Sequence, residues 1–298
     1  MDSAVDRYTG QIVDGEQLWY IDPVDKEGYI CRGCGVMVNP VSFEAHHKVR
    51  PHFKELPSKP HESWCDVEGE EKLVAKARKE RVTTQVGFPG SFPSKLQLVD
   101  EREKVAIPGA PIGGKGASSG GSSSGTATGK THTQWTAHTI RPICRTYINF
   151  PKDRDLPLSV PGADGNNYDE VIRKLVSQDI VVYPKQHIFV APLSWSKPKD
   201  IPGKIIVELS YGFWANKKLL SPYRLVIDSS SWSAAKKNYV LTELEVSRKE
   251  AKERADAGKK SEKSWVFFVG QQESTNPSDF VVSDHRLICC LTGELGNG

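Results

Sequence analysis

The sequence predicts an α+β fold made of two modules, and three observations support this prediction. Cysteines and histidines gather at short spacings between residues 31 and 65, glycine and serine then dominate one stretch, and short β-branched or aromatic runs fill much of the remainder. We therefore expect an N-terminal module over residues 1–105, a flexible linker over 106–131, and a mainly antiparallel β domain with one or two helices over 132–298.

Composition indicates an ordinary water-soluble protein. Hydrophobic residues make up 38% and charged residues 26% of the 298 positions, which suits two modest domains. The formal net charge of +3 is too small to indicate a polyanionic partner by itself. No apolar run approaches the ~18 residues that a membrane span needs, and the adjacent Cys289 and Cys290 favour a reducing compartment. These features predict a cytoplasmic protein of bacterial type with no membrane partner.

The N-terminal module is expected to contain short strands and one helix. Residues 17–21 are rich in apolar and aromatic side chains and predict a short alternating strand, which pairs with residues 29–30 across a turn. Residues 36–40 indicate a further strand that ends at a proline, and residues 96–99 indicate another. Residues 66–81 place acids early and bases late among helix-forming residues, which favours a helix because these charges complement the helix dipole.

The motif that carries chemistry lies between these elements. Two residues separate Cys31 from Cys34, and three separate His61 from Cys65, so two turns offer four soft or borderline ligands. This is the ligand set and the spacing that tetrahedral Zn²⁺ prefers. A redox-active pair at the first two cysteines is disfavoured because no βαβ pattern surrounds them. His52 is an alternative to His61 as the histidine ligand.

The same segment resembles the N-terminal, zinc-ribbon-like module of CoiA-like bacterial competence proteins and related uncharacterised bacterial proteins. The resemblance rests on residues 29–36, on Pro51-His52-Phe53 and on residues 61–66, and it covers about the first third of the chain. It implies that His52 and Phe53 pack around the metal rather than bind it. Those proteins continue into a nuclease-like domain, from which the rest of this chain departs. The zinc ligands that the resemblance implies are Cys31, Cys34, His61 and Cys65.

The second module is expected to be rich in β-strands. Residues 138–150 alternate over a long stretch and predict a strand or a bulged pair, with Pro142 at an edge or bulge. Asn167 is a suitable cap for an amphipathic helix over residues 167–177. The strongly charged residues 247–264 predict a protruding insert. Further short runs predict strands at residues 180–183, 187–190, 204–209, 223–227, 239–246, 265–269 and 286–291.

One alternative function is a divergent metal-dependent nuclease. Such enzymes place an Asp at the end of one strand and a Glu-x-Lys on the next, so that two carboxylates hold Mg²⁺. Asp228 ends a predicted strand, and Glu243 and Glu245 share one face of a later strand, but no lysine follows Glu245 at the required spacing. Surface carboxylates paired with nearby bases explain the same pattern, so no catalytic residue is assigned.

Tryptophans that stand beside lysines in turn-like segments favour a binding function. Aromatic rings on the loops of a small β domain stack on bases, and ammonium groups meet the phosphates. The sequence therefore predicts an accessory factor that binds single-stranded DNA or RNA. A module that binds a protein partner is the alternative, since most tryptophans serve in cores or interfaces. The predicted nucleic-acid contacts are Trp195, Trp214, Lys217, Lys218, Trp232, Lys236 and Lys237.

Overall fold

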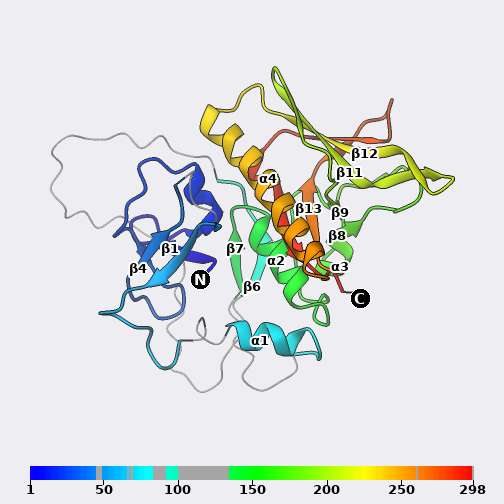
Figure 1. Ribbon diagram of the computed structural model, residues 1–298. Coiled ribbons are helices and arrows are strands. Elements are labelled where there is room, and N and C mark those ends of the chain that lie inside the picture. The colour runs from blue at the N-terminus through cyan, green and yellow to red at the C-terminus, as the bar shows by residue number, and fades with distance from the viewer. Residues whose placement is uncertain are drawn as a thin grey trace.

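The computed structural model describes residues 1–44, 49–65, 67, 70–82, 92–99, 134–259 and 261–296 (Figure 1). The predicted linker and the pair His46 and His47 lie outside these ranges. Within them the chain forms mostly antiparallel sheets with few helices, which confirms the predicted α+β class.

The N-terminal part is built from two small antiparallel sheets around one apolar core. In the first sheet β1 lies between β2 and β3, and in the second β4 pairs with β5. Buried residues of both sheets, among them Tyr29 and Phe53, form a single cluster. The strands are β1 (Ser3–Asp6), β2 (Ile12–Asp14), β3 (Tyr29–Ile30), β4 (Val38–Val41) and β5 (His52–Glu55).

Two predictions for this part need correction. Residues 17–21 do not form a strand, because the 3-10 helix η1 (Gly15–Trp19) begins after Asp14. The backbone N–H of Asp14 donates to Oε1 of Gln17 at 2.7 Å, half of a capping arrangement that the alternating pattern concealed. The helix predicted over 66–81 is present but shorter, as α1 (Glu70–Ala77).

The larger part of the fold contains the remaining elements. Its helices are α2 (Arg141–Asn149), α3 (Tyr168–Val171), α4 (Ala234–Asp256) and the 3-10 helix η2 (His285–Leu287). Its strands are β6 (Phe92–Leu96), β7 (Gln134–Ala137), β8 (Ile172–Lys174), β9 (Ile188–Pro192), β10 (Lys199–Ile201), β11 (Lys204–Ala215), β12 (Lys218–Asp228), β13 (Lys263–Val269), β14 (Gln271–Gln272), β15 (Asp279–Val282) and β16 (Ile288–Gly293).

Five strands close a small barrel, in which β13 and β14 together count as one strand. β9 lies antiparallel to β13, which continues through Gly270 into β14, and β14 lies antiparallel to β15. β15 is parallel to β12, and β12 is antiparallel to β11. A bridge between Leu193 and Leu209 returns from β11 to the end of β9. The interior is one apolar cluster with contributions from every strand, including Phe189, Phe268 and Phe280.

Helices cover two sides of this barrel. α2 and α3, together with β6 and β7, pack on the outward residues of β9 and β13 in a second core. α4 adds Tyr239, Val240 and Leu244 to the barrel core. In Figure 1 these helices stand between the N-terminal sheets and the pair β11 and β12. One broad surface of the barrel, formed by β11 and β12, therefore faces away from the N-terminal part.

Two segments that were predicted as strands are helices. Residues 138–150 contain α2, in which Ile143, Cys144, Tyr147 and Ile148 are buried at helical spacing. The strand predicted over 239–246 and the insert predicted over 247–264 are mostly one helix, α4, whose buried residues also recur every three or four positions. In both segments the β-branched and aromatic content favoured strand, but the 3.6-residue period decides the outcome.

The other strand predictions hold in part. Asn167 caps α3 as predicted, accepting from the Glu170 N–H at 2.9 Å, but the chain leaves the helix after one turn and enters β8. Residues 180–183 do not form a strand, and the strand predicted over 96–99 lies earlier, as β6. The remaining strands predicted for the second module overlap strands of the structure, although η2 takes up the start of the last.

The far end of the β11–β12 hairpin, residues 212–222, is called the hairpin arm. A Cβ at Gly212 would lie 2.2 Å from the carbonyl oxygen of Ser221, so the strands approach too closely there for any other residue. The arm ends in a turn in which Asn216 and Lys217 have φ of 50° and 62°, the type I′ geometry of tight hairpins. Phe213 and Leu220 are 43% and 60% exposed on the arm, where the register of the two strands shifts between Glu208 and Gly212 and again between Phe213 and Trp214.

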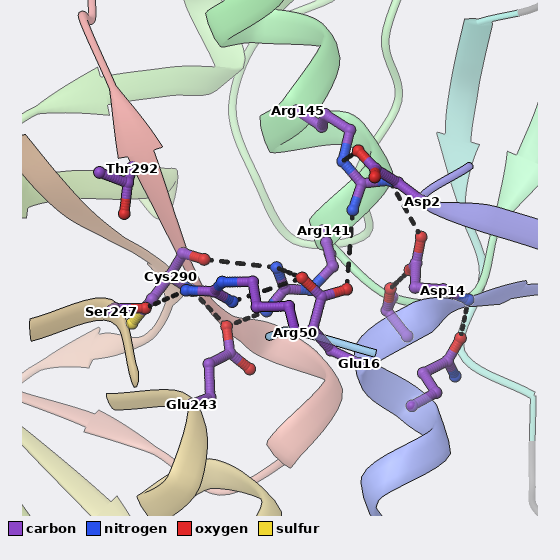
Figure 2. Close-up of polar contacts among 12 residues, drawn as sticks. Asp2, Asp14, Glu16, Arg50, Arg141, Arg145, Glu243, Ser247, Cys290 and Thr292 are labelled. Atoms are coloured by element: carbon purple, nitrogen blue, oxygen red, sulfur yellow. Dashed lines mark hydrogen bonds and ion pairs between the residues drawn. The ribbon is translucent and has the colours of Figure 1, made fainter. Parts of the chain in front are cut away.

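A buried ionic network joins the N-terminal part to α2 and α4 (Figure 2). Arg141 donates to Glu16 at 3.0 Å and also to Glu243, and all three side chains are almost fully buried. Arg50 donates to Glu250 at 2.7 Å across 200 residues of sequence. Because these side chains are largely withdrawn from solvent, each charge depends strongly on its partners.

The network gives folding stability a specific dependence on pH through Asp14. Burial raises the pKa of Asp14 from 3.8 to about 6, against the attraction of Arg145. The folded state therefore holds a proton on Asp14 that the unfolded state releases between pH 4 and 6. This stabilising contribution is complete below pH 3.8 and is lost as the pH rises through about 6.

We expect the variant Asp14→Asn, which keeps a helix-capping side chain, to lack this dependence. The stability of the wild type relative to the variant should fall by roughly 3 kcal/mol between pH 3.5 and 7. Urea denaturation of both proteins at several pH values measures the difference. A constant difference across that range would contradict the assignment.

Candidate metal centre

The four predicted ligands come together in the N-terminal part. Cys31 directly follows β3 and Cys34 completes the same turn, whereas His61 and Cys65 come from the loop after β5. Their ligand atoms all lie within 4.8 Å of one another. The Sγ atoms of Cys31 and Cys65 are 3.7 Å apart, and Nδ1 of His61 lies 3.3 Å from the Sγ of Cys34. This group is therefore placed to hold a single metal ion.

The first turn is shaped by backbone hydrogen bonds around Cys31. Its N–H donates to the carbonyl of Val36 at 2.7 Å, and the N–H of Gly35 donates to the Cys31 carbonyl at 2.9 Å. Gly35 has φ of 74°, which a residue without a side chain adopts freely. The N–H of Gly33 donates to the Cys31 Sγ at 3.3 Å. Such N–H···S contacts orient a thiolate and disperse its charge.

Two of the thiols differ strongly in acidity. Burial opposes ionisation of Cys34, but the N–H groups of Val36 and Glu62 and the His61 side chain lower its pKa to about 6. Burial raises the pKa of Cys65 to about 12, and its contacts with the other two thiols act in the same direction. The cluster thus holds one thiol that ionises readily beside one that ionises fully only when a cation is bound.

The surroundings of the cluster decide which histidine belongs to it. Cys31 and Cys65 are 2% and 7% exposed. Phe53 is fully buried next to Tyr29, with ring centroids 5.0 Å apart, so it packs beneath the site as predicted. Nδ1 of His52 instead contacts the carbonyl of Arg50 at 3.0 Å. Over the part of the chain that the structure describes, this cluster with His61 is the only group of three or more potential ligands.

Comparison with known proteins adds no assignment. Neither the protein-family models nor the curated proteins nor the solved structures contain a match to this chain. The likeness of residues 29–66 to the competence-protein module stays a prediction, and so does the zinc-ribbon description of the two small sheets.

The three carboxylates of the nuclease alternative do not form a site. Glu243 lies on α4 rather than on a strand, and it accepts from Arg141 and from the Cys290 N–H. Glu245 is exposed and pairs with Lys249 at 3.3 Å. Asp228 does end β12, where it accepts from the Ser230 hydroxyl at 2.7 Å. Glu243 is committed to the ionic network and is not available to a second metal.

The structure divides the predicted nucleic-acid contacts into two groups. Trp195 is 60% exposed in the loop after β9, and Trp214 is 40% exposed on the hairpin arm, with Lys217 and Lys218 at its turn. The second group, Trp232, Lys236 and Lys237, lies at the start of α4.

Members of the second group are tied to the fold. The indole N–H of Trp232 donates to the Ser283 carbonyl at 2.9 Å. Lys237 forms an ion pair with Asp200 at 2.7 Å, and the backbone N–H of Lys236 donates to Ser233 at the start of the helix. Sequence reasoning missed the exposed Phe213 and Leu220, although each stands within four residues of a predicted contact.

No helix in the described ranges has the length and apolar character that a membrane crossing requires.

Proposed function

We propose that this chain binds single-stranded nucleic acid and that its Cys₃His cluster holds Zn²⁺ as a structural ion. Three thiols and one imidazole are the donors that structural zinc sites use, and four protein ligands leave no open position for catalysis. Zinc would replace contacts that a core of this size lacks, by fixing two turns to each other. All six cysteines are free, which suits a reducing compartment such as a bacterial cytoplasm.

The nucleic-acid proposal rests on exposed aromatic rings that stand near lysines. Trp195 and Trp214 present 60% and 40% of their surface to solvent, whereas an indole normally packs inside or at an interface. Residues 193–222 contain five lysines and two acids, so this segment alone has the formal charge of +3 that the whole chain carries. Aromatic rings within a basic segment suit single-stranded nucleic acid, since the nucleobases stack on the rings and the lysines neutralise the phosphates.

Binding is tested with a fluorescein-labelled oligonucleotide of thymidines, followed by anisotropy at several salt concentrations. We expect affinity to fall steeply with salt, because each neutralised phosphate releases a counterion. The double variant Lys217→Glu/Lys218→Glu should weaken binding at least tenfold. The matched control is Lys249→Glu/Lys252→Glu on α4, which makes the same charge change at two exposed positions away from the hairpin arm.

Two results would overturn the proposal. One is the absence of oligonucleotide binding by the wild type at low salt. The other is an equal loss of affinity in both double variants, which would indicate that only net charge matters. Binding that is specific to the hairpin lysines supports the proposal over a protein-only interaction module.

A further inference from the structure

The connectivity of the barrel singles out one of its faces. β9, β11 and β12 come in this order along the chain, with the short strand β10 between β9 and β11. α4 comes next, and the path β13–β14 and then β15 complete the barrel, with β15 parallel to β12. Five-stranded Greek-key barrels of the oligonucleotide- and oligosaccharide-binding type bind ligands on their second and third strands. The loops between strands one and two and between strands four and five flank that face. In this chain the face belongs to β11 and β12, and the flanking loops are 193–198 and 273–278.

We infer that a single strand of nucleic acid crosses the outer face of β11 and β12, with Trp195 and Trp214 as stacking platforms. This inference rests on the proposed function and deepens it, because it places the ligand on one named surface and excludes the start of α4.

The two tryptophans occupy opposite ends of this face. The loop of Trp195 is fixed to the middle of β11, where the Ser194 N–H donates to the Glu208 carbonyl at 3.2 Å. Trp214 lies six positions after Glu208 on β11. At about 3.3 Å per residue the two ring positions are roughly 20 Å apart along β11. Such a separation accommodates several nucleotides, in keeping with the site sizes of about 4–16 nucleotides in barrels of this type.

Arg224 lies on the same face. Tyr223 and Leu225 are fully buried on β12, so Arg224 between them points outward, with 40% of its side chain exposed. Asp279 of β15 holds its guanidinium through two bonds of 2.6 and 2.7 Å. The pair holds a planar guanidinium in position on the surface, where it offers a stacking face while Asp279 balances its charge.

This face is also the uncovered side of the barrel. Figure 1 shows β11 and β12 on the side away from the N-terminal sheets, with α2 and α4 between the two. Residues 193–222 carry a formal charge of +3, although Lys199 pairs with Glu208 at 3.3 Å. A polyanion with exposed aromatic bases complements both the charge and the rings, whereas the ion pair of Lys237 with Asp200 neutralises the start of α4.

The test compares single substitutions on the face with a pair outside it. Trp195→Ala and Trp214→Ala should each weaken binding of a labelled 12-nucleotide thymidine strand by roughly 5- to 150-fold. Lys236→Ala/Lys237→Ala should change affinity less than twofold. Near-ultraviolet circular dichroism of each variant checks that it is folded. Cross-linking of a bromouridine-containing strand to the wild type, followed by peptide mapping, should identify segments 193–222 and 273–282.

The outcomes separate this inference from the proposed function. If the wild type binds the strand but both tryptophan variants bind equally well, the assigned face is wrong while the binding function stands. The same follows if the cross-links map to the start of α4. If the wild type does not bind at all, the proposed function fails and the inference fails with it. Affinity lost only at Trp195 and Trp214, with cross-links on the face, is the supporting result.

Discussion

Replacing Cys65 by serine is expected to release the metal ion and unfold the N-terminal part of the protein. Serine is a poor zinc ligand, and three remaining donors bind far more weakly than four. Zinc binding to small structural sites contributes on the order of 10–16 kcal/mol to folding. The loss should therefore exceed that of any single change outside the four ligands, and chelation of the wild type should have the same effect.

Elemental analysis of zinc per chain and far-ultraviolet circular dichroism follow the two consequences. Cys144→Ser is the matched control, because Cys144 is also fully buried but lies on α2, outside the cluster. We expect about one zinc per chain in the wild type and in the control, and none in Cys65→Ser. Full zinc content in Cys65→Ser, or none in the wild type, would contradict the proposed zinc site.

Replacing Arg141 by methionine should lower the free energy of unfolding by about 3–5 kcal/mol. Burial works against the charge of Arg141, but Glu16 and Glu243 raise its pKa well above its usual value. Burial likewise opposes ionisation of Glu16. The attraction of three nearby cations outweighs this effect and lowers the pKa of Glu16; they are Arg141, Arg145 and Arg50. Without Arg141, Glu243 stays buried with only the Cys290 N–H as its partner among the contacts described here. That uncompensated charge is the cause of the expected loss.

Urea denaturation measures the change, and three further variants isolate its cause: Glu245→Gln, Glu243→Gln and Arg141→Met/Glu243→Gln. Glu245→Gln on the same helix removes an exposed ion pair and should cost less than about 1 kcal/mol. Arg141→Met/Glu243→Gln removes both charges and should recover part of the loss, because no buried carboxylate is left unpaired. If the double variant were less stable than Arg141→Met by the full cost of Glu243→Gln, the two residues would act independently.

The cluster of potential metal ligands could be predicted from the sequence because it depends on short ligand spacings along the chain. The spacing of Cys31 and Cys34, and of His61 and Cys65, fixes two turns that each present two ligands. The choice between His52 and His61 needed coordinates, since both lie at suitable distances along the chain. His52 is the first residue of β5 and turns towards the Arg50 carbonyl instead.

Several secondary-structure predictions failed where two signals disagreed. Tyr239 and Val240 are residues that strands favour, but with Leu244 their spacing places them on one side of a helix that packs on the barrel core. Leu18 is buried by a short 3-10 helix rather than by strand pairing. In both places tertiary burial outweighs local preference.

The barrel and the ionic network could not be predicted, because both depend on pairs that are distant in sequence. Most barrel strands were predicted near their observed positions, but nothing local pairs β12 with β15 or joins β9 to β11. Glu243 illustrates the same limit. Its sequence context is that of a surface acid, whereas its partner Arg141 lies 102 residues earlier.

The long-range ion pairs also set an order of events during synthesis. The N-terminal sheets leave the ribosome before α2 and α4, so they can fold around the proposed metal ion while translation continues. Glu16 and Arg50 must then wait for Arg141, 125 residues after Glu16, and for Glu250, 200 residues after Arg50. Until α4 emerges, the nascent chain presents these charges to water. Docking of the early segment onto α4 therefore follows the synthesis of α4 itself.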